Sequence, residues 1–245
     1  MNTQRVLVVS AHSADWLWRC GGTIAKYLAG GAKVYVLCLT YGARGESGAL
    51  WKIPGQTTEA VKRARYEETI NAAESLGVTG IEMWDFDDCI LEINNTILQR
   101  MNEKIREVAP DVIITHDDGD NTNPDHAFAS EIVFRAALMA TQAGIESNGL
   151  APVKSMPIYG FEPSQTEESG FVPQVYVDIT DFFAAKEKAM ECIVAQKSVP
   201  EIHRRTNTHR GWQASRYANN SGIKYAESFT MRFPIVVHEL PLRHA

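Results

Sequence analysis

The stretch Val6–Trp16, VLVVSAHSADW, decides the fold and gives the first indication of a functional site. Its four leading apolar residues are typical of a short buried strand. The polar residues that follow cannot continue such a strand, so His12 and Asp15 lie just past its carboxyl end. Residues 20–23, CGGT, and a helical run over 24–29 come next. In an open α/β sheet, a loop between a strand and a helix at this place is where ligands bind.

His12 and Asp15 have the chemistry and the spacing of metal ligands. An imidazole and a carboxylate three residues apart can both reach one cation of the zinc type. Two ligands do not make a site, so a third must come from elsewhere in the chain. The alternative is an ordinary surface loop in which these two residues are incidental.

The composition is that of an ordinary globular protein of 245 residues, with 44% hydrophobic and 22% charged residues. No apolar run approaches the roughly 20 residues of a membrane span, and we expect no signal peptide. The four cysteines form no Cys-x-x-Cys pair and indicate free, buried or half-buried thiols in a reducing, cytoplasmic compartment. A net charge of −6 argues against nucleic-acid binding, although a local arginine cluster can still bind an anion.

Strands and helices alternate along the chain, which predicts an α/β fold. We expect further strands over 34–39, 81–84, 111–115, 156–161 and 175–179. We expect helices over 57–76, 90–108, 127–140 and 180–196. This alternation favours a Rossmann-like, mostly parallel sheet with helices on both faces. We find no internal repeat, linker or low-complexity tract and predict a single domain over residues 1–245.

A glycine-rich loop over 41–48, YGARGESG, follows the second predicted strand. Three glycines within seven residues let the backbone turn sharply or approach a ligand. An ordinary mobile loop is the alternative. Arg44 and Glu46 are the polar groups that this loop presents.

Two further segments carry charges that suit either a site or a plain surface. Arg65 and Glu68 lie three residues apart on the helix over 57–76, where a surface salt pair is the simplest interpretation. The segment 203–220, HRRTNTHRGWQASRYANN, is either a basic surface or an anion-binding wall, because arginine matches carboxylates with two hydrogen bonds.

The most polar segment of the chain is 116–126, HDDGDNTNPDH, which follows the predicted strand over 111–115. It leads into the helix over 127–140, with a Pro-Asp pair near the first turn, where both residues are favoured. His126 then lies at a helix N-terminus and faces the same sheet edge as His12. This position favours a metal site over the alternative, a solvated loop.

With these residues assembled, the chain resembles the PIG-L/LmbE family of zinc-dependent deacetylases over almost its whole length. That family has Ala-His-Pro-Asp-Asp-Glu after the first strand and Pro-Asp-His after the fourth. The matching stretches here are Ala11–Trp16, AHSADW, and Pro124–His126, PDH. The Arg65/Glu68 pair and Tyr225–Phe229, YAESF, are also similar to family features.

The resemblance implies a PIG-L/LmbE-like fold with a zinc ion at this edge of the sheet. His12, Asp15 and His126 would be its three ligands, with an open position for water or substrate. Another divalent ion stays open as an alternative, because two histidines and one aspartate do not select strongly among metals. The role of His116 stays open too.

One position departs from the deacetylase pattern. The first aspartate of the family signature is the general base that activates water, and Ala14 stands there in this chain. A methyl group cannot take a proton, and losing general-base help typically costs about 10²–10⁴ in rate. The chain is therefore either an impaired deacetylase or an enzyme that uses a different base.

Within the family, the chain is similar to the 4-oxalomesaconate hydratases of the gallate and protocatechuate 4,5-cleavage pathway. The likeness is carried by residues 10–15, 18–22 and 45–51 and continues through 210–214 and 223–227. Those enzymes hydrate the C=C bond of 4-oxalomesaconate, or of its enol 4-carboxy-2-hydroxymuconate, to give 4-carboxy-4-hydroxy-2-oxoadipate. The resemblance implies a metal-dependent hydro-lyase of aromatic catabolism.

The requirements of that reaction suggest roles for individual residues. Adding water to a conjugated alkene needs a Lewis acid, which zinc supplies, and a proton donor or acceptor at carbon, for which Glu46 is the candidate. The hydratase pattern has a histidine with an acid/base role after Glu-Pro, where this chain has Ser164, so that role is vacant or has moved. A di- or tricarboxylate substrate also needs cations, and four arginines are available: Arg44, Arg65, Arg210 and Arg216.

Two other functions remain as alternatives. The first is a PIG-L-type N-deacetylase with a substituted base at Asp117, Asp118 or Asp125. The second is a metal- or sugar-binding protein that has lost catalysis. Ala14 argues against the first, and the intact set of metal ligands argues against the second. We also expect a homo-oligomer, because members of the family commonly assemble.

Overall fold

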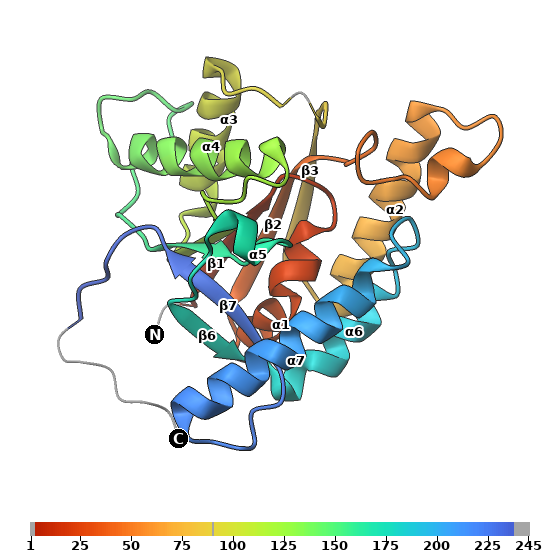
Figure 1. The fold of residues 1–245 in the computed structure, drawn as a ribbon. Coiled ribbons are helices and arrows are strands. Elements are labelled where there is room, and N and C mark those ends of the chain that lie inside the picture. The colour runs from red at the N-terminus through yellow and green to blue at the C-terminus, as the bar shows by residue number, and fades with distance from the viewer. Residues whose placement is uncertain (1–2, 90, 238–245) are drawn as a thin grey trace.

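The computed structural model describes residues 3–89 and 91–237, which form a seven-stranded sheet in the order β3-β2-β1-β4-β5-β7-β6 (Figure 1). Strands β1 to β5 run parallel wherever they pair, and β7 runs antiparallel to both β5 and β6. The strands are β1 (Arg5–Ser10), β2 (Lys33–Thr40), β3 (Gly80–Phe86), β4 (Val112–His116), β5 (Ile158–Phe161), β6 (Val175–Asp178) and β7 (Ala226–Met231).

Helices cover both faces of this sheet (Figure 1). Helices α1, α2 and α6 pack on one face, against Val6 and Val8 of β1. Helices α3 and α4 pack on the other, against Leu7 and Val9, because successive side chains of a strand point to opposite faces. The predicted Rossmann-like α/β fold is thereby confirmed. The helices are α1 (Asp15–Ala29), α2 (Thr58–Leu76), α3 (Asn95–Val108), α4 (Pro124–Thr141), α5 (Thr166–Ser169), α6 (Phe183–Met190) and α7 (Val199–Ala218), with 3-10 turns η1 (Leu50–Lys52) and η2 (Thr180–Phe182).

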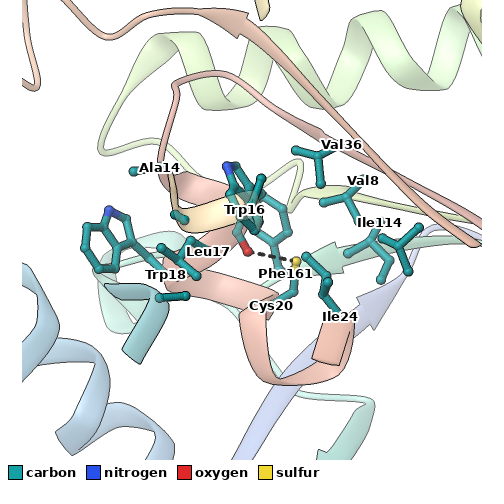
Figure 2. Packing of buried hydrophobic residues seen from close by; sticks show 14 of the residues in the cluster. Val8, Ala14, Trp16, Leu17, Trp18, Cys20, Ile24, Val36, Ile114 and Phe161 are labelled. Carbon is teal, nitrogen blue, oxygen red and sulfur yellow. Dashed lines mark hydrogen bonds between the residues drawn. The ribbon is translucent and has the colours of Figure 1, made fainter. Parts of the chain in front are cut away.

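Helix boundaries are where the sequence-based expectations were wrong. Helix α1 begins at Asp15, well before the predicted start at residue 24, and is kinked at Cys20 (φ −141°) instead of starting after the CGGT stretch. The Cys20 thiol donates to the Trp16 carbonyl oxygen within the buried cluster shown in Figure 2. Helix α3 begins at Asn95 because Asn94 caps it, and residue 90 of the predicted helix lies outside the described residues.

At the kink in α1, backbone N–H groups of the helix donate hydrogen bonds to a buried carboxylate. Glu227 of β7 accepts hydrogen bonds from the N–H groups of Gly22 (2.9 Å) and Thr23 (2.7 Å). Lys186 of α6 lies 2.7 Å from the same carboxylate, and both side chains are fully buried. Strand β7 therefore holds in place the helix that begins beside His12.

We predict that Lys186→Met lowers the free energy of unfolding by about 3–5 kcal/mol, because Glu227 is left as a buried charge without its counter-ion. Denaturant unfolding followed by circular dichroism measures this difference. Lys188→Met, at an exposed position of the same helix, is the matched control and is expected to be near neutral. Equal stabilities of the two variants would contradict the prediction.

Exposure of the cysteines partly follows the prediction. Cys20 and Cys38 are buried, Cys192 is half-buried and all four thiols are free, whereas Cys89 is exposed, contrary to expectation. None of the helices within residues 3–89 and 91–237 is long and apolar enough to cross a membrane.

The sheet has a topological switch point between β1 and β4. The chain passes from β1 outward to β2 and β3 on one side, and from β4 to β5 on the other. Ligands of open α/β sheets bind outside the carboxyl ends of the strands at such a point. The residues that follow β1, β2 and β4 are the ones that the sequence analysis selected.

Candidate metal and active site

Four side chains from three strand ends converge at the switch point. His12 and Asp15 follow β1, Glu46 follows β2, and His126 lies in the first turn of α4, after β4. One ligand atom from each lies within 4.8 Å of the others, a spacing that could hold a metal ion. The structure thus brings together the three predicted ligands and the predicted catalytic glutamate. Glu46 is the most accessible of them, with 17% of its side chain exposed.

The ring of His12 is held by carboxylates on both sides. Its Nε2 lies 3.0 Å from Asp125 Oδ2, and its Nδ1 lies 3.1 Å from Asp15 Oδ2. Donation from Nε2 to Asp125 leaves the Nδ1 lone pair facing the cluster, which is the carboxylate–histidine arrangement that orients metal-binding imidazoles. Asp125 also accepts from the backbone N–H of Cys89 (2.7 Å).

His126 has a similar arrangement, with the opposite ring nitrogen facing the cluster. Its Nδ1 lies 2.8 Å from Asp120 Oδ2. Its Nε2 is buried and has no hydrogen-bond partner among the described residues, although it lies 3.6 Å from Asp15 Oδ2. A buried nitrogen without a partner is costly unless something binds it. Asp120 belongs to the polar segment over 116–126, but no sequence pattern assigns it a role.

The converging atoms are nearly all acceptors, which is the physical reason why the cluster suits a cation. Burial by itself would lower the pKa of His12, but the surrounding carboxylates, Glu46 first and then Asp15, raise that pKa well above its ordinary value. Burial likewise opposes ionisation of Asp15, but the neighbouring histidines hold the pKa of its carboxyl well below the usual range. A proton on His12 or a bound metal ion neutralises this concentration of negative charge.

His116 is a buried neighbour of the cluster, and with Asp120 and His126 it forms a second group that could hold a metal ion. Its Nε2 accepts the backbone N–H of Ala11 at 2.9 Å and so ties the end of β4 to the end of β1. Its ring stacks on that of His126, with 4.1 Å between centroids. Burial and the nearby His126 lower the pKa of His116 to about 3, so the ring stays neutral at ordinary pH.

Ala14 caps the N-terminus of α1 and offers no polar group to the cluster. It is fully buried and belongs to the apolar cluster drawn in Figure 2. Asp15, the next residue, accepts the backbone N–H of His12 at 2.9 Å. The position where the deacetylase signature has its base is therefore part of the hydrophobic core.

The glycine-rich loop holds Glu46 over the cluster. Gly42 has φ +63°, a left-handed conformation that glycine adopts without strain, and a Cβ there would lie 3.2 Å from His12 Cβ. Asp88 accepts from the N–H groups of Arg44 and Gly45 (2.8 and 2.7 Å). Glu46 Oε1 then lies 3.3 Å from His12 Nδ1. These contacts argue against the alternative of an ordinary mobile loop.

The four predicted substrate-binding arginines have very different surroundings. Arg65 is completely buried and pairs with Glu68 at 2.9 Å, so the expected surface salt pair is wrong. Arg210 is buried against Glu162 at 2.6 Å. Arg44 is half-exposed and pairs with an aspartate, and Arg216 is exposed on α7. The segment 203–220 is mostly part of the helix α7, which is compatible with either a basic surface or an anion-binding wall.

Of the three aspartates considered as substitute bases, only Asp125 contacts the cluster. Asp118 pairs with Arg232 and is exposed. Asp117 accepts from Gly119 N–H (2.9 Å) and from the Thr230 hydroxyl. Asp125 already accepts from both His12 and a backbone N–H, as described above.

Arg19 is a neighbour of the site that the sequence analysis did not assign. It is buried, its Nε lies 3.8 Å from Asp15 Oδ1, and its Nη1 donates to the Glu162 carbonyl oxygen at 2.6 Å. Its Nη2 donates to the hydroxyl of Ser164 (3.2 Å), which is otherwise exposed. No spacing rule connects residues 19 and 164, so only the fold could show this contact.

The fold and the cluster together define a Rossmann-like α/β protein with a candidate metal centre at its switch point. The family model PIG-L, GlcNAc-PI de-N-acetylase, matches residues 7–137. A 4-oxalmesaconate hydratase of Pseudomonas putida is 38% identical over 98% of this chain and 94% of its own length. The chain belongs to the PIG-L family.

Other relatives and solved structures agree with this assignment. A diacetylchitobiose deacetylase of Thermococcus kodakarensis is 28% identical over 99% of this chain and 88% of its own. The crystal structure of GalB, the 4-carboxy-2-hydroxymuconate hydratase from Pseudomonas putida KT2440, superposes with a TM-score of 0.93 at 36% identity and covers 98% of this chain and 100% of that one. An N,N'-diacetylchitobiose deacetylase from Pyrococcus horikoshii shares the fold, with a TM-score of 0.76 at 23% identity, over 94% of this chain and 84% of its own.

Proposed function

We propose that this protein is a metal-dependent hydro-lyase. It adds water to the C=C bond of 4-oxalomesaconate, or of its enol 4-carboxy-2-hydroxymuconate, and forms 4-carboxy-4-hydroxy-2-oxoadipate. The names of the Pseudomonas relative and of the GalB structure support this substrate class. The reaction consumes one water, whose hydroxyl forms a bond to one alkene carbon while a proton is added to the other.

One observation carries the proposal. The carboxylate of Glu46 lies in the cluster, 3.3 Å from His12 Nδ1. The residue at position 14, where the deacetylase signature has its base, is the buried Ala14, which has no carboxylate. Glu46 is also the most accessible member of the cluster. An acid/base group on the open side of the site suits proton transfer at a substrate carbon.

We assign His12, Asp15 and His126 as the ligands of the metal, with zinc as the favoured ion. The fit rests on the lone pairs of His12 Nδ1 and His126 Nε2, which face the Asp15 carboxylate while their other nitrogens are held by Asp125 and Asp120. A bound zinc ion supplies a Lewis acid that polarises substrate oxygens. Glu46 holds or moves the proton at the carbon beside the new C–O bond.

The substrate carboxylates require positive charge near this cluster. Arg44 lies on the same loop as Glu46 and is half-exposed, so its guanidinium can exchange Asp87 for a substrate carboxylate. Arg65 and Arg210 are buried in ion pairs with Glu68 and Glu162, and their binding of substrate stays a prediction. The binding role of Arg216, the homo-oligomer and the cytoplasmic location stay predictions.

A two-substrate assay on zinc-loaded protein tests the proposal. One arm follows loss of the conjugated ultraviolet absorbance of 4-oxalomesaconate, and the other follows amine release from a panel of N-acetyl sugars. Absorbance loss that a chelator abolishes supports the hydro-lyase. Amine release without absorbance loss would establish the deacetylase instead, and zinc binding with neither activity would establish a non-catalytic homologue.

We predict that Asp120→Ala weakens zinc binding about 10–100-fold, because His126 loses the carboxylate that orients its ring. A competition titration against a chromogenic chelator measures the zinc Kd. Asp118→Ala, which removes an exposed aspartate of the same polar segment, is the control and should bind zinc as the wild type does. An unchanged Kd for Asp120→Ala would remove Asp120 from the site.

A further inference from the structure

We infer that Gln196 is a positioning residue for Glu46. Gln196 lies in the turn between α6 and α7, about 150 residues along the chain from the glycine-rich loop, and is half-buried. Its Nε2 lies 3.4 Å from Glu46 Oε2. The inference rests on the proposed acid/base role of Glu46 and adds the group that sets its orientation.

The orientation of the Gln196 amide is determined by its neighbours. Its Oε1 accepts from Arg65 Nη2 at 3.1 Å and from the indole N–H of Trp18 at 3.4 Å. A guanidinium and an indole N–H are donors only, so the amide oxygen must face them. The amide nitrogen consequently faces Glu46 and cannot exchange places with the oxygen.

The segment that carries Gln196 is itself held in place by a buried carboxylate. Glu68 Oε1 accepts the backbone N–H groups of Val194 (3.1 Å) and Ala195 (2.9 Å). Glu68 Oε2 pairs with Arg65, whose Nε also donates to the Tyr41 carbonyl oxygen at 3.3 Å. The buried pair on α2 thus joins the turn before α7 to the start of the glycine-rich loop.

In this arrangement the two carboxylate oxygens of Glu46 make different contacts. Oε2 receives the Gln196 hydrogen bond, whereas Oε1 faces His12 Nδ1 (3.3 Å) and His126 Nε2 (4.0 Å). A glutamate on a loop has several rotamers, and the hydrogen bond to Oε2 favours the one that presents Oε1 to the cluster. Arg65 and Glu68 therefore serve the site through Gln196, which gives the buried pair a functional role.

The test compares Gln196→Glu with Gln196→Met and with the exposed control Lys197→Met. Gln196→Glu keeps an acceptor for Arg65 and Trp18 but replaces the donor to Glu46 with a second carboxylate, which repels it. We expect both substitutions at position 196 to lower kcat about 10-fold or more, the effect of one hydrogen bond to a charged group. KM and zinc content of Gln196→Met should stay close to wild type because this substitution adds no charge, and Lys197→Met should leave kcat unchanged.

A merely structural role makes a different prediction, because the loss of kcat in Gln196→Met would then follow its loss of thermal stability. A Gln196→Glu variant with kcat within about twofold of wild type would overturn the inference. Thermal melting separates a folding defect of Gln196→Met from a catalytic one.

The second arm repeats both substitutions in a Glu46→Gln background. If Gln196 acts through Glu46, the further loss of kcat should be within about twofold, because coupled residues are not additive. An undiminished loss in that background would also overturn the inference. If the wild-type protein had no hydratase activity, the proposed function would be overturned, and this inference with it. If the wild type were active but the Gln196 variants behaved as the wild type does, only this inference would be overturned.

Discussion

Replacing His12 with alanine is expected to abolish bound zinc and to lower the hydration rate about 10³-fold or more, since a catalytic metal contributes several kcal/mol of charge stabilisation. His12 is the centre of the cluster: its Nδ1 faces Asp15 and Glu46, and its Nε2 contacts Asp125. Its removal therefore deletes a proposed ligand and leaves three carboxylates close together without the imidazole between them.

Zinc content per chain, measured by elemental analysis, and the ultraviolet hydration assay together check this expectation. His209→Ala is the matched control, because His209 is an exposed histidine on α7 that stacks on Trp212. The control should retain zinc and activity. A His12→Ala protein that keeps one zinc per chain and a wild-type rate would show that the metal centre has been misassigned.

The isosteric change Glu46→Gln is expected to lower kcat by about 10²–10⁴ while leaving the zinc content unchanged, because the amide fills the same space but cannot hold or release the proton. Glu46 Oε1 is close enough to both histidines to be a fourth ligand. The zinc measurement decides between these roles, because a ligand role would lower the zinc content and an acid/base role would not.

Glu67→Gln is a suitable control for this substitution. Glu67 is exposed on α2, directly beside the buried Glu68. Glu67→Gln therefore changes the net charge by the same amount as Glu46→Gln but leaves the cluster unaltered. If the Glu46→Gln variant hydrated the substrate at the wild-type rate, we would conclude that another carboxylate holds or releases the proton. Asp125 would then be the next residue to test, since its Oδ2 lies 3.0 Å from His12 Nε2.

Local patterns predicted the parallel part of the sheet and most of the cluster, but not the antiparallel strand β7. Short apolar runs that are followed by polar residues mark strand ends, and the carboxyl ends of parallel strands meet at one edge of the sheet. His12, Asp15, Glu46 and His126 could therefore be placed at one edge of the sheet from local sequence alone. The start of α1 was wrong because the two glycines of CGGT suggest a break, whereas the helix passes through a kink that Glu227 stabilises from the far end of the chain.

The tertiary structure decided which charged groups support the site. The sequence by itself determined the α/β class and the strand-end positions of His12, Asp15, Glu46 and His126, because these depend on neighbours within a few residues, whereas the set of metal ligands was implied by the family resemblance. It could not show that Asp120 and Asp125 orient the two imidazoles, or that Arg65 lies buried behind Gln196. Those roles depend on which segments pack together, and segments such as 65–68 and 194–196 meet only when α2 and the turn after α6 cover the same face of the sheet.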